Sequence, residues 1–340
     1  MGEFLMYLAI ILVGGVLVWK GSDLLESSAE QLSAYYGLPA VVHGTIVIAV
    51  GSSFPELSST VLATLLHGEF ELGMSTVVGS AIFNILVIPG LSGLASKNGL
   101  ATDRDLVFRD AQFYITSVAV LIITFCLAVV YHPQPNTPLT GFITPWLAIV
   151  PLALYGLYIF IQAQEVKDAK QPRDKSVNPV KAWAVLILSL VLIVGGVEGL
   201  VSSAIFLGDY FHTPSFLWGI LVIATVTSIP DAIISVRLAR KGDGVASLGN
   251  VLGSNIFDLL VAIPLGIIIV GTPVLVDLEV AVPLFAVLTM ATILLFVSMR
   301  LRLGLSRMES WVLLTAYGVF TLWIILETLG YLNFLPDNTA

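Results

Sequence analysis

The sequence predicts an all-α membrane protein with ten transmembrane helices, arranged as two inverted-topology repeats of five. Three observations lead to this prediction: an apolar composition, basic residues confined to alternate connections, and a motif pattern that recurs in the second half. Of the 340 residues, 57% are hydrophobic and only 11% are charged, whereas soluble domains carry about 25% charged residues. Such a chain is expected to be embedded in a lipid bilayer.

Ten segments are apolar and long enough to cross a bilayer, which takes about 20 residues. Gly, Pro and polar residues interrupt the second, third, seventh and eighth of them. We therefore expect these four helices to be discontinuous and to form an ion site at the membrane midplane, as broken helices do in secondary transporters. The predicted spans are Phe4–Leu24, Leu38–Leu66, Leu72–Leu94, Phe113–Tyr131, Phe142–Ile161, Ala182–Phe206, Phe216–Leu238, Val245–Val270, Val280–Met299 and Trp311–Leu326.

The basic residues predict the orientation. All 15 Lys and Arg residues lie at or in the first, third, fifth, seventh and ninth connections, and the intervening connections carry none. Because basic residues concentrate on the cytoplasmic side, both termini are expected outside, in a multi-pass protein of the plasma or inner membrane. The formal charge of −8 without a basic patch argues against nucleic-acid binding. The sequence gives no sign of an obligate protein partner.

One extended polar stretch, residues 164–181, divides the chain into two halves. We expect residues 1–163 to form the first repeat, residues 164–181 a cytoplasmic linker, and residues 182–340 the second repeat. The single cysteine, Cys126, excludes an internal disulfide and a cysteine-based metal cluster. The prediction contains no catalytic residue and no cofactor, so the protein is not expected to be an enzyme.

An internal repeat becomes visible when the sequence is shifted by 175 residues. Glu56 then meets Asp231, each directly after a proline, and after one deletion GSAIFN at 79–84 meets GSNIFD at 253–258. An odd number of spans separates the copies, so the second copy must be inverted in the membrane, as is typical of secondary transporters. The alternative is chance recurrence of small-residue motifs, which serve helix packing in membranes.

Three carboxylates, Glu56, Asp231 and Asp258, fall within the predicted spans. A charge at mid-bilayer costs about 2.5–3.5 kcal/mol on insertion scales, and the apolar middle of the spans holds no Lys or Arg to offset it. The counter-charge must therefore be protons or bound cations. The structural alternative is protonated carboxyls that hydrogen-bond between helices. Asp23 and Glu198 also pair in the repeat but lie nearer helix ends, and we interpret them as structural or entrance-lining.

Neighbouring oxygen atoms favour cations. Hydroxyl side chains lie three or four residues before the carboxyl and amide side chains, on the same helix face. Pro55 and Pro230 cannot donate to the carbonyls of Gly51 and Val226, which become further oxygen ligands. Hard oxygen ligands with no Cys or His nearby favour Na⁺, K⁺, Ca²⁺ or Mg²⁺ over zinc or copper. The hydroxyls are those of Ser52, Ser53, Ser80, Thr227, Ser228 and Ser254.

These motifs resemble the two α-repeats of the cation/calcium antiporter superfamily. The first copy, GTIVIAVGSSFPELSS with GMSTVVGSAIFNIL, resembles the sodium/calcium exchangers. The second, TSIPDAIISVRLARKGDGVASLGNVLGSNIFDLL, resembles in particular the potassium-dependent branch. The resemblance implies a ten-helix fold, ion sites on spans two, three, seven and eight, and Ca²⁺ extrusion driven by Na⁺ influx.

The resemblance also implies roles for individual residues. Glu56 and Asp231 become acidic cation ligands, and Asn84 and Asp258 are the equivalents from the GSxxxN/D turns. Val226 stands where the family usually has Gly, and Asp231 where many prokaryotic members have Glu, so local unwinding and ion affinity are expected to depart from the family pattern. The implied Na⁺ ligands are the side chains of Ser53, Ser80, Ser228 and Ser254 and the carbonyls of Ala49 and Ala224.

Alternative functions use the same residues. An H⁺-coupled Ca²⁺ or cation antiporter would use the same carboxylates. Asp258, as a third carboxylate, would allow K⁺ to be carried with Ca²⁺; otherwise it is protonated or serves as an ordinary Na⁺ ligand. An intramembrane aspartyl protease built on Asp231 and Asp258 lacks the sequence setting of such enzymes and has no use for an inverted repeat. A passive channel would conduct ions far faster than an antiporter.

Overall fold

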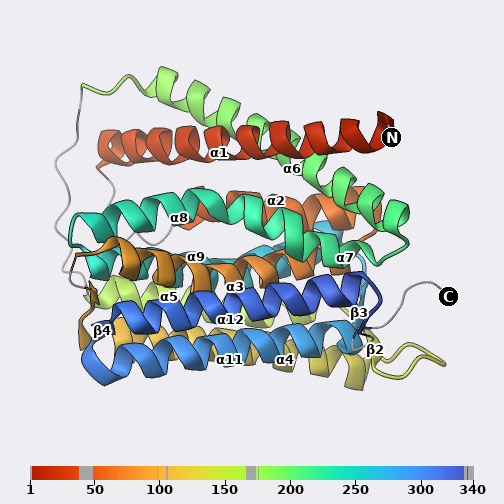
Figure 1. The fold of residues 1–340 in the computed structure, drawn as a ribbon. Helices are drawn as coiled ribbons and strands as arrows, with labels where there is room; N and C mark the ends of the chain where they lie inside the picture. Colours follow the sequence, from red (N-terminus) through yellow and green to blue (C-terminus); the bar gives the residue numbers. More distant parts are fainter. Residues whose placement is uncertain are drawn as a thin grey trace.

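The computed structural model describes residues 2–37, 49–97, 99–104, 106–165, 174, 176–332 and 335. These residues form a helical molecule with four short strands (Figure 1). In the described part, nine helical segments are long and apolar enough to cross a membrane. The predicted span Leu38–Leu66 is not among them, because residues 38–48 lie outside the described residues and only its remainder is seen, as helix α2.

The helices match the other nine predicted spans, with shifted ends. The first half contains α1 (Gly2–Tyr36), α2 (Ala49–His67), α3 (Phe70–Ala95), strand β1 (Leu100–Ala101), the π-helical turn η2 (Leu106–Asp110), α4 (Ala111–Tyr131), β2 (Thr140–Ile143) and α5 (Pro145–Glu165). The second half contains α6 (Pro179–Phe211), α7 (Ser215–Trp218), the π-helical turn η3 (Gly219–Ile223), α8 (Ala224–Arg240), α9 (Gly244–Phe257), the π-helical turn η4 (Asp258–Ala262), α10 (Ile263–Val270), β3 (Val274–Asp277), α11 (Leu278–Arg302), β4 (Gly304–Leu305) and α12 (Arg307–Thr328).

Helices α1 and α6, of 35 and 33 residues, pack along each other at one edge of the molecule (Figure 1). Small residues let their backbones approach closely. A Cβ atom on Gly14 would lie 2.9 Å from the carbonyl oxygen of Gly196, and one on Gly21 would lie 3.1 Å from that of Ser189. Both helices are longer than the roughly 20 residues that a bilayer requires. Their excess length carries polar residues beyond the apolar layer.

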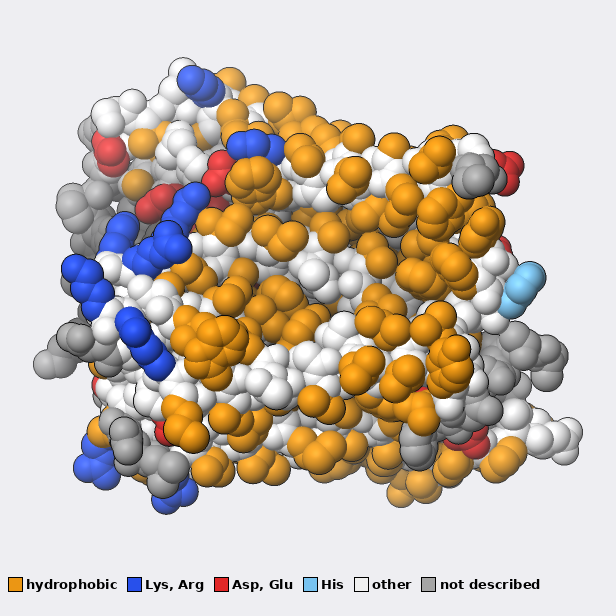
Figure 2. Space-filling view, in the orientation of Figure 1, with side chains coloured by type: hydrophobic (Ala, Val, Ile, Leu, Met, Phe, Trp, Pro, Cys, Tyr) orange, Lys and Arg blue, Asp and Glu red, His pale blue; other side chains and the backbone are white. Residues whose placement is uncertain are grey.

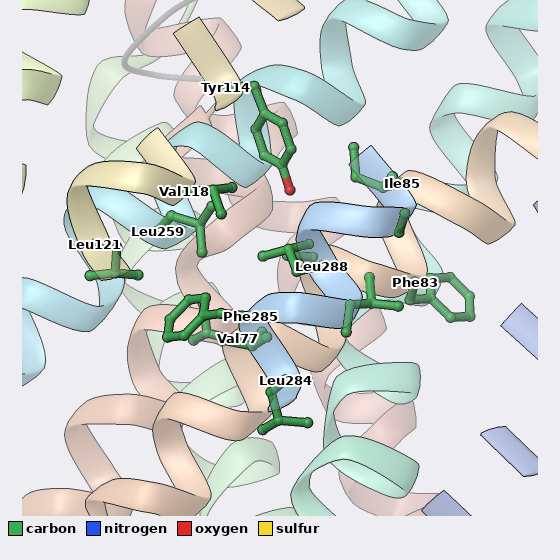
Figure 3. Close-up of a cluster of buried hydrophobic side chains, with 14 of the residues drawn as sticks. Val77, Phe83, Ile85, Tyr114, Val118, Leu121, Leu259, Leu284, Phe285 and Leu288 are labelled. Carbon is green, nitrogen blue, oxygen red and sulfur yellow. The ribbon is translucent and has the colours of Figure 1, made fainter. Parts of the chain in front are cut away.

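Helix α3 is the central helix and is buried along most of its length. Figure 3 shows Val77 and Ile85 of α3 together with Val118 of α4 and Leu288 of α11, all inside the main apolar cluster. Because these side chains interlock on several sides of α3, its polar residues are held at fixed positions in the interior.

Two of the four segments predicted to be discontinuous contain π-helical turns. The turn η3 leads directly into α8, and η4 begins at Asp258 between α9 and α10. Such turns occur frequently at functional sites. In contrast, α3 is an uninterrupted α-helix, and the break predicted there is not found. Its Gly79 serves close packing instead, since a Cβ atom there would lie 3.0 Å from the Cβ of Ala224. In its described part, α2 is also helical through Pro55.

Two small antiparallel sheets join the halves of the chain. Strand β1 pairs with β4, with Leu100 opposite Leu305, and β2 pairs with β3, with Ile143 opposite Val274. Figure 1 places β4 at one end of the helices and β2 and β3 at the other. Each sheet therefore takes one strand from each half, and the two sheets lie at opposite ends.

The surface is that of a membrane protein. Apolar side chains cover the face shown in Figure 2, and Lys and Arg side chains gather at one end, opposite the start of α1. Leu12, Val130 and Trp146 are 69–80% exposed, which would be unfavourable in water but is favourable against lipid. The protein is therefore a multi-pass membrane protein, with the basic end on one side of the bilayer.

Candidate ion-binding site

Four helical segments bring the predicted acidic and amide side chains into the interior. Glu56 comes from α2, Asn84 from α3, Asp231 from α8, and Asp258 from the first position of η4. None is more than 3% exposed. Ser80 of α3 donates a hydrogen bond to Oε1 of Glu56 at 3.2 Å. The sequence repeat thus corresponds to side chains that are buried in the middle of the molecule.

Two hydroxyl contacts connect the helices that carry these groups. The Oγ atoms of Ser80 in α3 and Ser228 in α8 lie 2.8 Å apart, and Oγ of Ser53 in α2 donates to the carbonyl of Ser254 in α9 at 3.4 Å. In the repeat, Ser80 corresponds to Ser254 and Ser53 to Ser228. The two contacts are therefore counterparts of each other. They join α3 to α8 and α2 to α9, and the bond from Ser80 to Glu56 connects the two pairs.

Hydroxyl groups also lie beside the three carboxyls. Thr227 lies next to Glu56, and Ser254 lies next to Asp231. Ser53 lies next to Asp258. Each carboxyl therefore faces a hydroxyl from a different helical segment, and both oxygen types are ligands that alkali and alkaline-earth cations accept.

The remaining predicted residues lie at the edge of this group. Ser52 is buried and lines a cavity described below. Ala49 and Ala224 are the first residues of α2 and α8. The carbonyl oxygen of Ala224 accepts a hydrogen bond from Oγ1 of Thr227 at 3.3 Å, which occupies one of its two lone pairs.

Five buried oxygen atoms at the site accept no hydrogen bond: Oε2 of Glu56, Oδ1 of Asn84, Oδ1 of Asp231 and both carboxyl oxygens of Asp258. Leaving a buried acceptor unpaired costs about 1–3 kcal/mol, and more when it is charged. Among the described residues, no Lys, Arg or His side chain is buried, so no internal basic group compensates. Such a set of acceptors fits cations or protons.

The acidic groups do not form a compact metal centre. Within the described part of the chain, no three His, Cys, Asp or Glu side chains are grouped closely enough to hold a metal ion by themselves. A cation at this site would therefore be held by a mixture of carboxyl, amide, hydroxyl and carbonyl oxygens. That mixture is typical of Na⁺ and Ca²⁺ sites and unlike a zinc site.

Two residues that support the site, Asn255 and Tyr114, were not predicted from the sequence. Asn255 of α9 accepts a hydrogen bond from Nδ2 of Asn84 at 2.9 Å, and its own Nδ2 donates to the carbonyl of Ala81 at 3.1 Å and to the hydroxyl of Tyr114 at 3.3 Å. These bonds fix the Asn84 amide so that its Oδ1 stays free. A signal was present in the sequence, because Asn255 faces Ala81 in the repeat alignment.

A cavity of about 500 Å³ lies near the basic end, and its lining includes Lys20, Arg237 and Lys241. It is lined by residues of α1, α2 and α8. Among them, Ser52 lies four residues before Glu56 in the sequence, and Pro230 directly precedes Asp231. Asp23, which the sequence predicted to be structural or entrance-lining, is among its lining residues. Sequence neighbours of two of the buried carboxyls therefore line a cavity that also holds basic residues of the end of α8.

Comparisons with known proteins agree with the geometry. The family model described as sodium/calcium exchanger protein matches residues 6–164 and 181–326. Inner membrane protein YrbG of Escherichia coli is 28% identical over 279 residues, 79% of each chain. Sodium/calcium exchanger MaX1 of Methanosarcina acetivorans is 26% identical over 286 residues, 75% of this chain and 81% of that one. Human sodium/potassium/calcium exchanger 4 is 34% identical over 166 residues, 47% of this chain and 24% of that one.

Two solved structures share the fold. The sodium-calcium exchanger NCX_Mj, 22% identical, superposes with a TM-score of 0.61 over 93% of this chain and 98% of that one. The H⁺/Ca²⁺ exchanger CAX, 16% identical, superposes with a TM-score of 0.72 over 95% of this chain and 82% of that one. Since the family model covers most of the sequence, the chain belongs to the sodium/calcium exchanger protein family, a family of membrane transporters and not of enzymes.

Proposed function

We propose that this protein is a secondary active antiporter that exchanges Na⁺ for Ca²⁺ by alternating access. One observation carries the proposal: five buried oxygens on α2, α3, α8 and η4 accept no hydrogen bond, and no described basic side chain is buried with them. Such oxygens need a positively charged partner, and transported cations would supply it. Relatives named as sodium/calcium exchangers support the same choice of ions.

The charge of the site makes the two ions competitors. Glu56, Asp231 and Asp258 supply at most three negative charges. Three Na⁺ ions or one Ca²⁺ ion would each nearly balance them, and both would use the same oxygens. A 3:1 exchange, the ratio that the family resemblance implies, moves one net charge in each cycle. Transport is then electrogenic, and an inside-positive potential favours Ca²⁺ influx.

The proposal includes an inverted repeat of residues 1–163 and 182–340, joined by a cytoplasmic linker, with both termini outside. The exchanged contacts support it: β1 with β4 has its counterpart in β3 with β2, and Ser80 with Ser228 has its counterpart in Ser254 with Ser53. The gathering of basic side chains at one end supports the orientation (Figure 2).

Cysteine labelling tests this topology. In a Cys126→Ser background, Arg240→Cys at the basic end and Asn136→Cys in the β2 connection should react with an impermeant maleimide from opposite sides of the membrane. The two positions are exposed, so labelling reports sidedness directly. Labelling of both from one side would contradict the inverted repeat.

The transport function is tested with purified protein in proteoliposomes. Vesicles loaded with Na⁺ should accumulate ⁴⁵Ca²⁺ when diluted into Na⁺-free buffer, and vesicles loaded with choline should not. Clamping an inside-positive potential with valinomycin and K⁺ should accelerate the uptake. Uptake that needs no Na⁺ gradient, or that ignores the potential, would rule out electrogenic Na⁺ exchange.

A second candidate is H⁺-coupled Ca²⁺ antiport, and the same geometry favours it. Buried carboxyls without a basic partner bind protons as readily as metal cations. The fold is shared with a structure named as an H⁺/Ca²⁺ exchanger. A pH gradient imposed without Na⁺ on either side separates the candidates: Ca²⁺ accumulation under that condition alone would assign proton coupling.

A further inference from the structure

The ends of α2 and α8 are built alike. His67 ends α2 and is followed by Gly68, whose φ is +72°; Lys241 follows α8 and precedes Gly242, whose φ is +85°. Both glycines adopt the left-handed conformation, which favours glycine because it lacks a Cβ. An acidic residue then precedes the next helix in both halves. His67 and Lys241 are therefore counterparts, placed at opposite ends of the inverted molecule.

Each of these basic residues has an acidic residue of the other half nearby. Glu198 of α6 lies beside His67, and Asp23 of α1 lines the same cavity as Lys241. Asp23 and Glu198 are counterparts in the repeat. Exchanging the two halves therefore converts the pair His67–Glu198 into the pair Lys241–Asp23.

The two pairs are in different states. Nε2 of His67 lies 2.8 Å from Oε1 of Glu198, which also accepts a hydrogen bond from Ser202 at 3.1 Å. This contact fastens the end of α2 to α6 at the end of the molecule away from the basic residues. Asp23 and Lys241 make no ion pair with each other, although the structure describes both, and the cavity of about 500 Å³ lies between their helices.

We propose that the protein has two matched ionic gates that close in turn. The outer gate, His67–Glu198, is closed in this conformation; the inner gate, Asp23–Lys241, is open and closes when α1 and α8 come together and eliminate the cavity. The proposal rests on the alternating-access function, because a carrier must never open its site to both sides at once. Arg237, another lining residue, offers Asp23 a second cation on closure.

The composition of the cavity favours a gate over a cation site. Its charged lining residues are three basic and two acidic: Lys20, Arg237 and Lys241, against Asp23 and Glu26. The two acidic residues are outnumbered by basic ones, so they do not form a cation site of their own. Opposite charges on facing helices instead attract each other, and this attraction strengthens as the cavity closes and water leaves.

Two cysteine reporters in the Cys126→Ser background measure the gates. Leu238→Cys reports on the inner gate, because Leu238 lines the open cavity. Ala63→Cys reports on the outer gate, because Ala63 is the residue that the repeat pairs with Leu238, and it is buried one turn before His67. Labelling is measured in full-length protein in proteoliposomes, with Na⁺ and Ca²⁺ absent. Glu198→Gln should raise the labelling rate of Ala63→Cys about threefold, as expected for the loss of one partly exposed ion pair. Asp23→Asn should lower the labelling rate of Ala63→Cys about threefold, because it weakens the inner gate and so destabilises the conformation in which the outer gate is open.

Matched variants control for general effects of charge. Glu30→Gln on α1 and Asp209→Asn on α6 remove exposed carboxylates outside both gates and should leave labelling unchanged. The exchanged pair His67→Glu with Glu198→His should restore the parental rate, which also shows that the variants fold. Changes in the same direction for Glu198→Gln and Asp23→Asn, or no change in either, would overturn the proposal, as would a failure of the exchanged pair to restore the rate.

Flux measured in the same vesicles separates this proposal from the proposed function. If Glu198→Gln and Asp23→Asn shift the labelling rate in opposite directions but no Na⁺-driven Ca²⁺ uptake is seen, the gates are supported and the choice of ions is contradicted. Na⁺-driven uptake with unchanged labelling would support the exchanger and contradict the gates. Leu238→Cys should respond in the sense opposite to Ala63→Cys, and parallel responses of the two reporters would likewise contradict the gates.

Discussion

The GSAIFN turn of the first half and the GSNIFD turn of the second occupy matching places but are held differently. Asn84 is neutral, and its amide is fixed by Asn255, which is itself bonded to Tyr114. Asp258 carries a carboxyl group with both oxygens unpaired. A symmetric scaffold thus holds an asymmetric site, in which one side is fixed and neutral and the other is acidic and free to change its partner.

The largest effect is expected where the halves are most alike. Glu56→Gln and Asp231→Asn each remove one charge from a buried ion site, and breaking such a site costs about 3–5 kcal/mol, which corresponds to more than 100-fold in rate. Both should abolish Na⁺-driven ⁴⁵Ca²⁺ uptake to a similar extent, whereas the exposed Glu30→Gln should transport normally. Near-normal flux in either variant would show that the site lies elsewhere.

The second prediction places an asparagine at the end of both the GSAIFN and the GSNIFD turn. Asp258→Asn removes the unpaired carboxyl, and we expect Ca²⁺ flux to fall about tenfold, the cost of one charge-assisted contact. Replacing K⁺ with choline in wild type and variant decides what neutralises this carboxyl. If wild type slows and the variant does not, K⁺ is carried with Ca²⁺; a wild type indifferent to K⁺ makes Asp258 an ordinary Na⁺ or Ca²⁺ ligand.

The third prediction removes the support of the first turn. Asn255→Ala reproduces the alanine that the first half has at this place, and it frees the Asn84 amide to rotate. Of the three hydrogen bonds that Asn255 makes, only the bond from Asn84 reaches the ion site. Its loss is worth about 1 kcal/mol, so the KM for Ca²⁺ should rise about fivefold while kcat changes little. Asn136→Ala, in an exposed connection, is the control. A variant with unaltered KM would mean that Asn255 does not position Asn84.

The smallest effect is expected one step further from the ions. Tyr114→Phe removes the hydroxyl that accepts a bond from Asn255 but leaves the other bonds of Asn255 in place. We expect the KM for Ca²⁺ to rise about twofold, because one neutral hydrogen bond of three is lost. Combined with Asn255→Ala, it should add nothing, since both act through the same amide. Full additivity would separate Tyr114 from this chain of contacts.

The sequence predicted the parts of this molecule that depend on composition and pattern. Spans follow from apolar length, and the pairing of Glu56 with Asp231 follows from the repeat. It did not predict what depends on packing between distant segments. The bond between Asn84 and Asn255 requires α3 and α9 to be adjacent, and the contact of His67 with Glu198 requires the end of α2 to meet α6. The predicted break in α3 failed because its glycines admit neighbouring helices instead of unwinding.

The two small sheets have a consequence for how the chain is made. Leu100 pairs with Leu305, and Ile143 pairs with Val274. Each strand of the first half therefore remains unpaired until a much later part of the chain has been synthesised. At ribosomal rates of about 5–20 residues per second, the roughly 200 residues that separate β1 from β4 take about 10–40 seconds. During that interval the first five helices are inserted but lack the strands that close both of their ends. Closure of both ends must therefore wait until α11 and β4 have been made. The nascent first half is the stage at which membrane chaperones would find unpaired backbone to bind.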